Sequence, residues 1–318
     1  MVRPGHVLVS LKATAVCGTD IGIYQGKVRI PYPRILGHES TGQVVEIGSA
    51  VTGVRPNDRI VLNPLIFCRS CYQCFAGKVN LCENGGLMGR EADGTFAEFV
   101  VVPEYNVIKI PDSISYEEGT SLVALATVIQ SHTKVKIVPG DVVAVIGQGA
   151  AGLMQTQMAL LSGAGPVYAI ARSRWKLDIA KGFGAMPVDA KEVNPVQAIM
   201  DATGGRGADL VIESVGSATT LRQAMDMVRP GGNVLFFGIA PASLDNFNGY
   251  TMYYKDMSLI GTRAMTPGDF YSAIKVVETG KLDIRTIISH RFELQDVKKA
   301  LDLVDKTPGD ALRVVVNI

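Results

Sequence analysis

Residues 142–152 read VVAVIGQGAAG, and this stretch decides the fold. A short β-branched run leads into Gly147, Gly149 and Gly152, which have the G-x-G-x-x-G spacing. Such glycines make a tight turn, let the backbone approach a pyrophosphate and let a helix pack on a strand. The spacing alone is a weak signal in a chain with 34 glycines. Here a second apolar run, 167–171, follows after a helix-like stretch, so the sequence predicts a dinucleotide-binding βαβ unit.

The helix of this unit is expected to begin at Ala150, and its first turn, with Ala151, directs unpaired N–H groups at the phosphate. The second strand is followed by Arg172, Ser173 and Arg174. Enzymes that prefer NAD place a carboxylate here for the ribose 2′-hydroxyl. Because no carboxylate is present and two guanidiniums can hold a 2′-phosphate, the sequence favours NADP(H) over NAD(H). The alternative is a pair of arginines on an exposed helix turn.

The composition excludes several classes of function. The 318 residues suffice for two domains and a large core. A net charge of +1 provides no basic field for nucleic acid. No apolar run reaches the roughly 18 residues of a membrane span. The first residues lack a signal-peptide core, so a cytoplasmic protein is expected, and its five cysteines then argue for metal binding or catalysis rather than disulfides.

The order of predicted elements indicates an α/β protein with two domains. Residues 1–120 are rich in strands and turns, which is typical of an antiparallel, barrel-like β domain. Residues 121–264 alternate strands and helices, which is typical of a doubly wound parallel sheet of the Rossmann type. Residues 265–318 are expected to return to the first domain, which makes that domain discontinuous. The strands are expected at 7–13, 40–47, 59–62, 96–102, 142–146, 167–171, 185–188, 209–213, 233–237, 258–260 and 312–316, and the last two helices at 269–280 and 294–304.

Four cysteines form the sharpest local signal. Cys68, Cys71, Cys74 and Cys82 follow the pattern C-x2-C-x2-C-x7-C. Four thiolates so close in sequence can surround one Zn²⁺ and leave no open position, as in a structural site. The alternative is an iron–sulfur cluster, whose bacterial run is C-x2-C-x2-C-x3-C-P. The longer last gap and the absence of a following proline favour structural zinc.

A second set of metal-ligating residue types lies earlier in the chain. Cys17 begins Cys-Gly-Thr-Asp, and His38 and Glu39 follow about twenty residues later. A thiolate, an imidazole and a carboxylate can hold a metal with one position open to a substrate. By residue type alone, a lone cysteine and a lone histidine are more often core residues.

The motifs together resemble those of zinc-containing medium-chain alcohol dehydrogenases. The resemblance covers essentially the whole chain and is closest to the sorbitol, butanediol and threonine dehydrogenase branch. It rests on the motifs at 17–20, 37–39, 68–82, 147–152 and 231–232.

The resemblance implies roles for five residues. Cys17 and His38 resemble ligands of a catalytic zinc, Glu39 resembles the flanking carboxylate that can join the metal, and Thr19 matches the hydroxyl that passes the alcohol proton. Arg313 resembles the basic residue that family members direct at the pyrophosphate. The substrate would be a secondary alcohol, polyol or ketone, bound in a cleft between the domains.

Three departures from the family pattern leave alternatives open. Val123 stands where the polyol branch has a glutamate as third zinc ligand, and Gly22 stands where many members have a relay histidine. The family also usually has a β-hairpin ahead of the strand that here begins at Val7. Two alternatives to a zinc-dependent dehydrogenase are therefore a zinc-free NADPH-dependent reductase that keeps only the structural zinc, and a non-catalytic NADPH-binding relative.

The expected partner is a small molecule, with neither nucleic acid nor membrane involved. The exposed sheet edge near 258–262 is a place where two subunits can pair across a two-fold axis. A homodimer or homotetramer is therefore expected.

Overall fold

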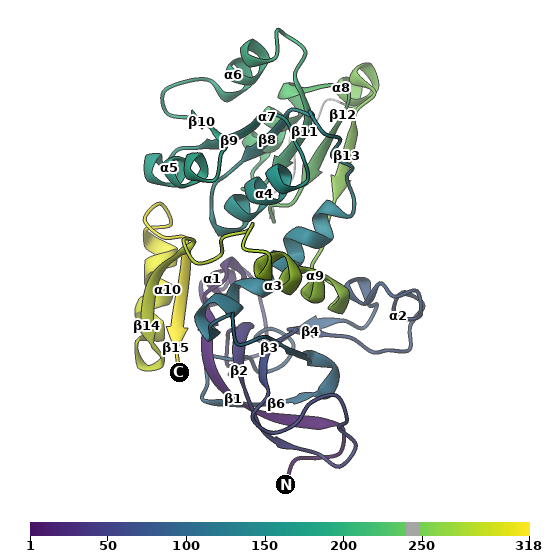
Figure 1. Ribbon diagram of the computed structural model, residues 1–318, viewed down its shortest axis with the longest axis vertical. Coiled ribbons are helices and arrows are strands. Elements are labelled where there is room, and N and C mark those ends of the chain that lie inside the picture. The colour runs from purple at the N-terminus through teal and green to yellow at the C-terminus, as the bar shows by residue number, and fades with distance from the viewer. Residues whose placement is uncertain (240–248) are drawn as a thin grey trace. The chain divides into compact units, whose positions relative to one another are not determined.

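The computed structural model describes residues 1–239 and 249–318 and divides the chain into two compact units (Figure 1). Unit 1 comprises Met1–Thr127 and Met265–Ile318, and unit 2 comprises Val128–Ala264. The first division falls inside helix α3 (Tyr116–His132), as does the boundary expected after residue 120. None of the described helices is long and apolar enough to span a membrane.

Unit 2 contains a parallel sheet of six strands within its described residues, in the order β10-β9-β8-β11-β12-β13. Every neighbouring pair is parallel, so the predicted doubly wound sheet is confirmed. Each strand lies within a few residues of its expected place. The strands are β8 (Val143–Ile146), β9 (Val167–Ala171), β10 (Met186–Asp189), β11 (Ala208–Glu213), β12 (Val228–Phe236) and β13 (Ser258–Gly261).

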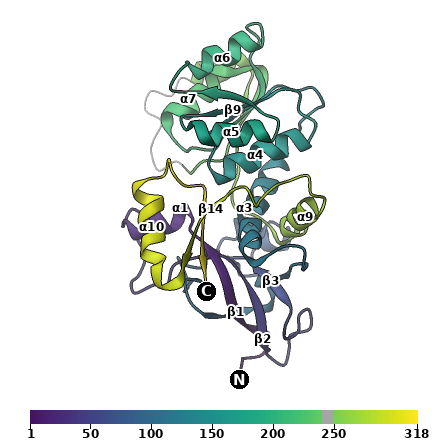
Figure 2. The ribbon, with the colours of Figure 1, turned by 60° about the vertical axis from the view of Figure 1, so that its left-hand side comes forward.

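Helices pack on the sheet of unit 2, and Figure 2 shows α4 and α5 lying together in front of it. Helix α4 begins at Ala150, as predicted. A Cβ atom at Gly152 would lie 1.9 Å from the carbonyl oxygen of Gly147, so only glycine allows the helix to start so close to the loop. The helices are α4 (Ala150–Leu161), α5 (Arg174–Gly182), α6 (Pro195–Ala202), α7 (Ala218–Met227) and α8 (Gly249–Lys255).

Unit 1 is built on a second, mainly antiparallel sheet in the order β14-β15-β1-β2-β3-β7, with β6 also paired to β1. Alternate residues of β1, beginning with Val7 and Val9, are fully buried, which explains why this long strand is central. The pair β14–β15 is parallel, an exception to the expected antiparallel pattern. The strands are β1 (His6–Ala15), β2 (Glu39–Ile47), β3 (Arg59–Leu62), β6 (Phe99–Pro103), β7 (Val107–Lys109), β14 (Ile288–Glu293) and β15 (Arg313–Asn317).

Shorter elements complete unit 1. A two-stranded sheet, β4 (Leu65–Ile66) with β5 (Gly86–Leu87), carries the cysteine-rich segment. The helices are α1 (Gly18–Tyr24), α2 (Tyr72–Phe75), α9 (Pro267–Glu278) and α10 (Val297–Lys306), with 3₁₀ turns η1 (Val79–Leu81), η2 (Glu104–Asn106) and η3 (Leu294–Asp296).

Three of the differences from the sequence-based expectations have a local physical reason. The strand expected at 96–102 begins only at Phe99, because the amides of the preceding residues bond to a different loop. The helix expected at 294–304 opens as the 3₁₀ turn η3 before α10. Helix α3 was not anticipated, because it is apolar on most sides and its sequence lacks a clear helical stripe.

Candidate metal centre and cofactor loop

The four-cysteine segment folds so that its sulfurs meet. The Sγ atoms of Cys68, Cys71, Cys74 and Cys82 all lie within 4.8 Å of one another. The backbone N–H of Cys68 donates to Cys82 Sγ at 3.3 Å, and Cys71 precedes the first residue of α2. We call this group, residues 68–82, the four-cysteine lobe. A tetrahedral Zn²⁺ needs four converging thiolates of this kind.

The thiols of the four-cysteine lobe differ in acidity. Hydrogen bonds from Ser70 lower the pKa of Cys68 to about 5, whereas desolvation raises the pKa of Cys74 to about 12. Contacts among the sulfurs contribute to both shifts, since neighbouring cysteines help to lower the pKa of Cys68 and to raise that of Cys74. Four converging sulfurs are a donor set that fits a bound Zn²⁺.

A second group of donors lies in unit 1. Cys17 Sγ, a ring nitrogen of His38 and a carboxylate oxygen of Glu39 lie within 4.8 Å of one another. Cys17 follows the end of β1, and His38 immediately precedes β2, whose first residue is Glu39. The antiparallel register pairs Ala15 with Glu39, so the two strands bring these residues together. We call Cys17, His38 and Glu39 the mixed-ligand centre.

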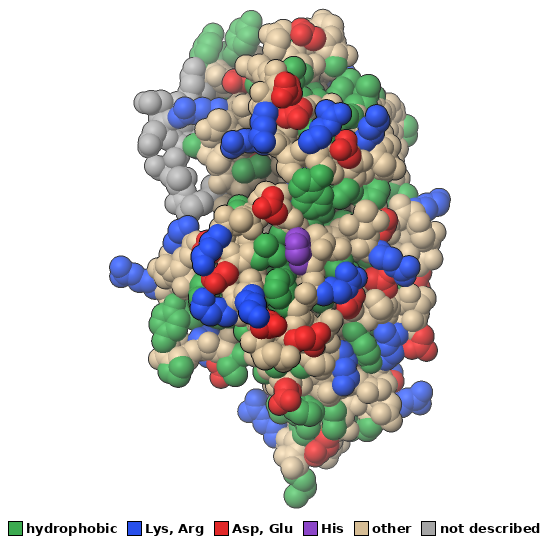
Figure 3. All heavy atoms as spheres, turned by 90° about the vertical axis from the view of Figure 1, so that its left-hand side faces the viewer, with side chains coloured by type: hydrophobic (Ala, Val, Ile, Leu, Met, Phe, Trp, Pro, Cys, Tyr) green, Lys and Arg blue, Asp and Glu red, His purple; other side chains and the backbone are tan. Residues whose placement is uncertain are grey.

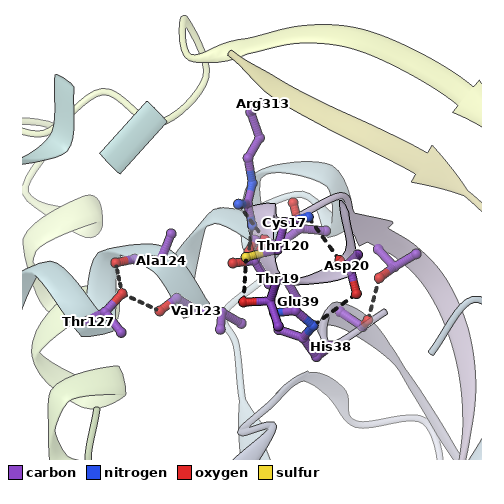
Figure 4. A network of polar contacts seen from close by, with 12 residues as sticks. Cys17, Thr19, Asp20, His38, Glu39, Thr120, Val123, Ala124, Thr127 and Arg313 are labelled. Atoms are coloured by element: carbon purple, nitrogen blue, oxygen red, sulfur yellow. Dashed lines mark hydrogen bonds and ion pairs between the residues drawn. The ribbon is translucent and has the colours of Figure 1, made fainter. Parts of the chain in front are cut away.

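Asp20 is a residue of this site that the sequence did not single out. It is fully buried, and its carboxylate accepts hydrogen bonds from the backbone N–H groups of Cys17 at 2.9 Å and Gly37 at 3.0 Å. It also lies 3.3 Å from His38 Nδ1 (Figure 4). Its place at N3 of α1, three residues after Cys17, is a capping-box position, which is the sequence signal for it.

The electrostatics of His38 follow from this contact. Burial by itself lowers the pKa of His38, but the negative charges of Asp20 and Cys17 outweigh burial and raise that pKa well above its ordinary value. An anionic partner on one ring nitrogen fixes the ring orientation and leaves the other nitrogen as a donor for a metal.

Glu39 is shared with a buried arginine. Arg313 Nη1 lies 2.5 Å from Glu39 Oε2 as an ion pair, and both side chains are at least nine-tenths buried. Among the described residues, neither Glu39 Oε2 nor Arg313 Nε has a hydrogen-bond partner. Arg313 Nη2 donates to the carbonyl oxygen of Thr120. Figure 4 shows Arg313 reaching Glu39 from β15, within unit 1.

The remaining predicted residues of this centre are also nearby. Thr19 Oγ1 lies 3.8 Å from Cys17 Sγ. Val123 of α3 is buried and offers no donor, so among the described residues the donor group consists of Cys17, His38 and Glu39 alone. Three protein ligands are the usual number at a catalytic zinc, and a thiolate, an imidazole and a carboxylate are ligand types that zinc accepts. The residues present therefore fit a metal.

The predicted cofactor residues lie in unit 2, except Arg313. Gly147, Gly149 and Gly152 form the turn between β8 and α4, and Ala151 lies in the first turn of the helix. A second residue that the sequence did not single out is Gln148. Its buried amide donates to Val145 O and accepts from Thr156 Oγ1, both at 3.0 Å. These bonds connect the loop to β8 and to α4. The G-x-G-x-x-G motif leaves the residue at this position unspecified, so it does not predict the role of Gln148.

The residues expected at the 2′-phosphate lie at the end of β9. Arg172 is exposed, Ser173 precedes α5, and Arg174 begins that helix. Arg174 Nε lies 3.4 Å from Asp178 Oδ1, and both side chains are mostly exposed. No carboxylate stands among residues 171–174. Lysine and arginine side chains intermix with aspartate and glutamate over the face in Figure 3, as the net charge of +1 leads one to expect.

Two family models match the chain: the alcohol dehydrogenase GroES-like domain over residues 3–112 and the zinc-binding dehydrogenase over residues 150–279. L-threonine 3-dehydrogenase of Pyrococcus furiosus is 34% identical over 297 residues, which cover 91% of this chain and 85% of the relative. Sorbitol dehydrogenase 1 of Saccharomyces cerevisiae is 31% identical over 325 residues, which cover 98% and 91%.

Solved structures agree with these relatives. A protein of Sinorhizobium meliloti 1021, described as a zinc-binding dehydrogenase and crystallised with NADP, is 32% identical and superposes with a TM-score of 0.93, over 100% of this chain and 93% of that one. The fold, the motifs and the relatives lead to one assignment. The chain is an NAD(P)-dependent oxidoreductase and belongs to the zinc-containing medium-chain alcohol dehydrogenase family.

Proposed function

We propose that the protein transfers a hydride between NADP(H) and a secondary alcohol, polyol or ketone, and that it depends on zinc. The observation that carries the proposal is the convergence of Cys17, His38 and Glu39 within 4.8 Å, beside the hydroxyl of Thr19. A soft thiolate, an imidazole and a carboxylate form a donor set that suits zinc.

The side chains of the mixed-ligand centre then have separate tasks. Cys17, His38 and Glu39 would hold the zinc, which would supply Lewis-acid chemistry that acidifies an alcohol or polarises a ketone. Asp20 orients His38. Thr19 relays the proton of the substrate hydroxyl: during oxidation its oxygen accepts that proton while its own hydroxyl proton passes to water, and the transfer runs in reverse during reduction. The hydride step itself belongs to the nicotinamide.

For the cofactor, the proposal assigns the pyrophosphate to the loop with Gly147, Gly149, Ala151 and Gly152, which opens α4. Arg172, Ser173 and Arg174 would hold the 2′-phosphate, since no carboxylate at this strand end repels it. Arg313 remains proposed for the pyrophosphate, on the family resemblance.

We propose that the four-cysteine lobe binds a structural zinc. We also propose that the protein, which acts on small molecules, forms a homodimer or a homotetramer. Strand β13 lies at one edge of the described sheet of unit 2. If the β13 strands of two subunits pair, the exposed β13 edge of each subunit is covered.

One observation favours a second candidate function. Val123 removes the carboxylate that α3 would otherwise supply, which suits a reductase that keeps only the zinc of the four-cysteine lobe. Substitution Cys17→Ala distinguishes the two. We expect NADP⁺-dependent oxidation of secondary alcohols to fall by about a thousandfold or more if zinc is required. Unchanged turnover in Cys17→Ala would favour the zinc-free reductase.

The cofactor preference has its own test. We expect Arg172→Ala to weaken NADP⁺ binding by about tenfold and to leave NAD⁺ binding nearly unchanged, because one charge-assisted contact with the 2′-phosphate is lost. Fluorescence titration of both cofactors measures this. Lys181→Ala, at the far end of α5, is the matched control. Equal weakening of both cofactors would contradict the NADP(H) assignment.

A further inference from the structure

The backbone of residues 93–96, which we call the clamp segment, holds the loop that presents His38. Asp93 Oδ1 accepts a hydrogen bond from Ile35 N at 3.1 Å, and three successive amides of the clamp segment donate to carbonyls of residues 35–37. These bonds join Gly94 N to Ile35 O at 2.8 Å, Thr95 N to Leu36 O at 2.9 Å and to Gly37 O at 3.0 Å, and Phe96 N to Leu36 O at 2.9 Å. The residues just before His38 are therefore held by main-chain hydrogen bonds outside any sheet.

The contact leaves no room for a side chain between the two segments. A Cβ atom at Gly94 would lie 2.2 Å from Gly37 O and 2.6 Å from Leu36 O. Real Cβ atoms do not approach backbone oxygens so closely, so glycine at 94 is required by this packing. The clamp segment and the loop before His38 thus touch backbone to backbone.

A cluster of three buried hydroxyls fastens the clamp segment to the sheet. Ser40 Oγ lies 2.5 Å from Thr95 Oγ1 and 2.7 Å from Thr14 Oγ1, and the two threonine oxygens are 3.3 Å apart. All three side chains are fully buried. Ser40 directly follows Glu39, and Thr14 is the register partner of Ser40 on β1, three residues before Cys17. The cluster therefore connects β1 with β2, the two strands whose ends adjoin Cys17 and His38 and whose first paired residues include Glu39.

Burial of three hydroxyls has a cost that apolar side chains of similar size would avoid. In return the hydroxyls satisfy one another and specify how the clamp segment sits on β1 and β2, since directional bonds fix geometry in a way that apolar contacts do not.

From this arrangement we infer that Thr95 is a positioning residue of the mixed-ligand centre. Its amide fixes the carbonyls before His38, and its hydroxyl fixes the same segment to Ser40, beside Glu39. Thr95 thereby sets how closely His38 and Glu39 approach Cys17. The effect of Thr95 on catalysis rests on the proposed function. The hydrogen bonds by which Thr95 holds the loop before His38 are present in the metal-free chain.

The test compares the Zn²⁺ affinity of Thr95→Val with that of Thr95→Ser. The affinity is measured by competition with a chromophoric chelator, on protein whose four-cysteine lobe already contains Zn²⁺. We expect Thr95→Val to weaken Zn²⁺ binding at the mixed-ligand centre by about tenfold or more, the usual effect of losing an outer contact of a metal site. Thr95→Ser restores the hydroxyl and should bind like the unaltered protein. Equal affinity in Thr95→Val and the unaltered protein would overturn the inference.

The matched control is Thr41→Val. Thr41 is also fully buried on β2, but its hydroxyl donates to Tyr116 O at 2.7 Å and has no contact with the clamp segment. We expect it to keep the Zn²⁺ affinity, and a loss equal to that of Thr95→Val would contradict a specific role for Thr95. If Thr95→Val does not fold, Ser40→Ala removes the shared hydroxyl with little change of volume, and the same weakening is expected.

Hydrogen exchange separates this inference from the proposed function. Amides 94–96 should exchange faster in Thr95→Val than in Thr41→Val, with or without Zn²⁺, because they donate to the loop before His38. If the unaltered chain binds no second Zn²⁺, the proposed function fails, yet faster exchange still supports the positioning role. Unchanged exchange in Thr95→Val would refute positioning even if Zn²⁺ binds.

Discussion

The four-cysteine lobe and the mixed-ligand centre both bring metal donors within 4.8 Å, but they do so by different means. The lobe takes its four sulfurs from fifteen consecutive residues, so one local turn geometry suffices. The mixed-ligand centre joins Cys17 to His38 and Glu39 through the pairing of β1 with β2, and Asp20, Arg313 and the clamp segment surround it. The four-cysteine lobe offers four donors, as a closed structural site does, whereas the mixed-ligand centre offers three, which would leave one position of a tetrahedral zinc open.

Chelation should separate the two sites most strongly. Four thiolates hold a metal more tightly than three mixed donors, so mild chelation should remove metal from the mixed-ligand centre and leave the four-cysteine lobe loaded. We expect the activity to fall to background and to return when Zn²⁺ is added. Metal content per chain by plasma mass spectrometry, measured alongside activity, tests this. If both metals stay bound under mild chelation, or if activity persists after one metal is lost, the proposed difference between the two sites is contradicted.

Two cysteine substitutions should break the sites one at a time. Cys74→Ser removes a ligand of the four-cysteine lobe and should lower Tm by about 5–10 °C, since metal binding there is coupled to folding. Cys17→Ser should change Tm much less but abolish metal binding at the mixed-ligand centre. Calorimetry with metal analysis on both variants measures the contrast. A larger loss of Tm in Cys17→Ser than in Cys74→Ser would reverse our assignment of structural and catalytic roles.

The pH dependence of zinc binding should sharpen the difference. The raised pKa of His38 means that its protonated form stabilises the metal-free fold at low pH, and that this contribution is lost as the pH rises through the raised pKa. Because zinc needs the neutral imidazole, its affinity for the mixed-ligand centre should fall by about tenfold per pH unit below that pKa.

Asp20→Asn isolates the cause of this pH dependence. It removes the charge that raises the pKa of His38, so proton competition should begin at a lower pH. The variant should bind zinc about tenfold more weakly at high pH, through loss of the orienting carboxylate, and approach the unaltered protein as the pH falls. Chelator competition at several pH values measures this, with Asp302→Asn as a surface control. Parallel curves for Asp20→Asn and the unaltered protein would contradict the account.

The smallest effect is expected at Val123. Val123→Ala should lower the free energy of unfolding by about 1–3 kcal/mol through a small cavity in α3. It should change zinc affinity by less than about threefold, because the valine contributes no ligand. Denaturant unfolding and chelator competition measure the two quantities. A marked change in affinity would mean that α3 shapes the mixed-ligand centre more than its chemistry indicates.

The sequence predicted the features that repeat known local patterns. The strand ahead of Gly147, the start of α4 at Ala150 and the alternating strands of unit 2 are encoded by neighbouring residues, so spacing alone locates them. The convergence of the four-cysteine lobe was also predictable, because its ligands are close in sequence.

The remaining features depend on contacts between distant segments. Asp20 was missed because its role comes from the approach of Gly37 and His38. The pairing of Arg313 with Glu39 requires β15 to lie beside β1, and no spacing rule gives that. The late start of β6 follows from the bonds of residues 94–96 to residues 35–37, which compete with strand pairing and are invisible in local propensity.

The register of β1 against β2 has a consequence for how such a chain can change in evolution. Side chains alternate between the two faces of a strand, so slipping β2 by one residue would turn Glu39 to the opposite face. The links from Ala15 to Cys17 and from His38 to β2 are too short to gain or lose a residue without moving these side chains. Insertions and deletions in descendants should therefore spare these two links, whatever substrate the descendants come to use.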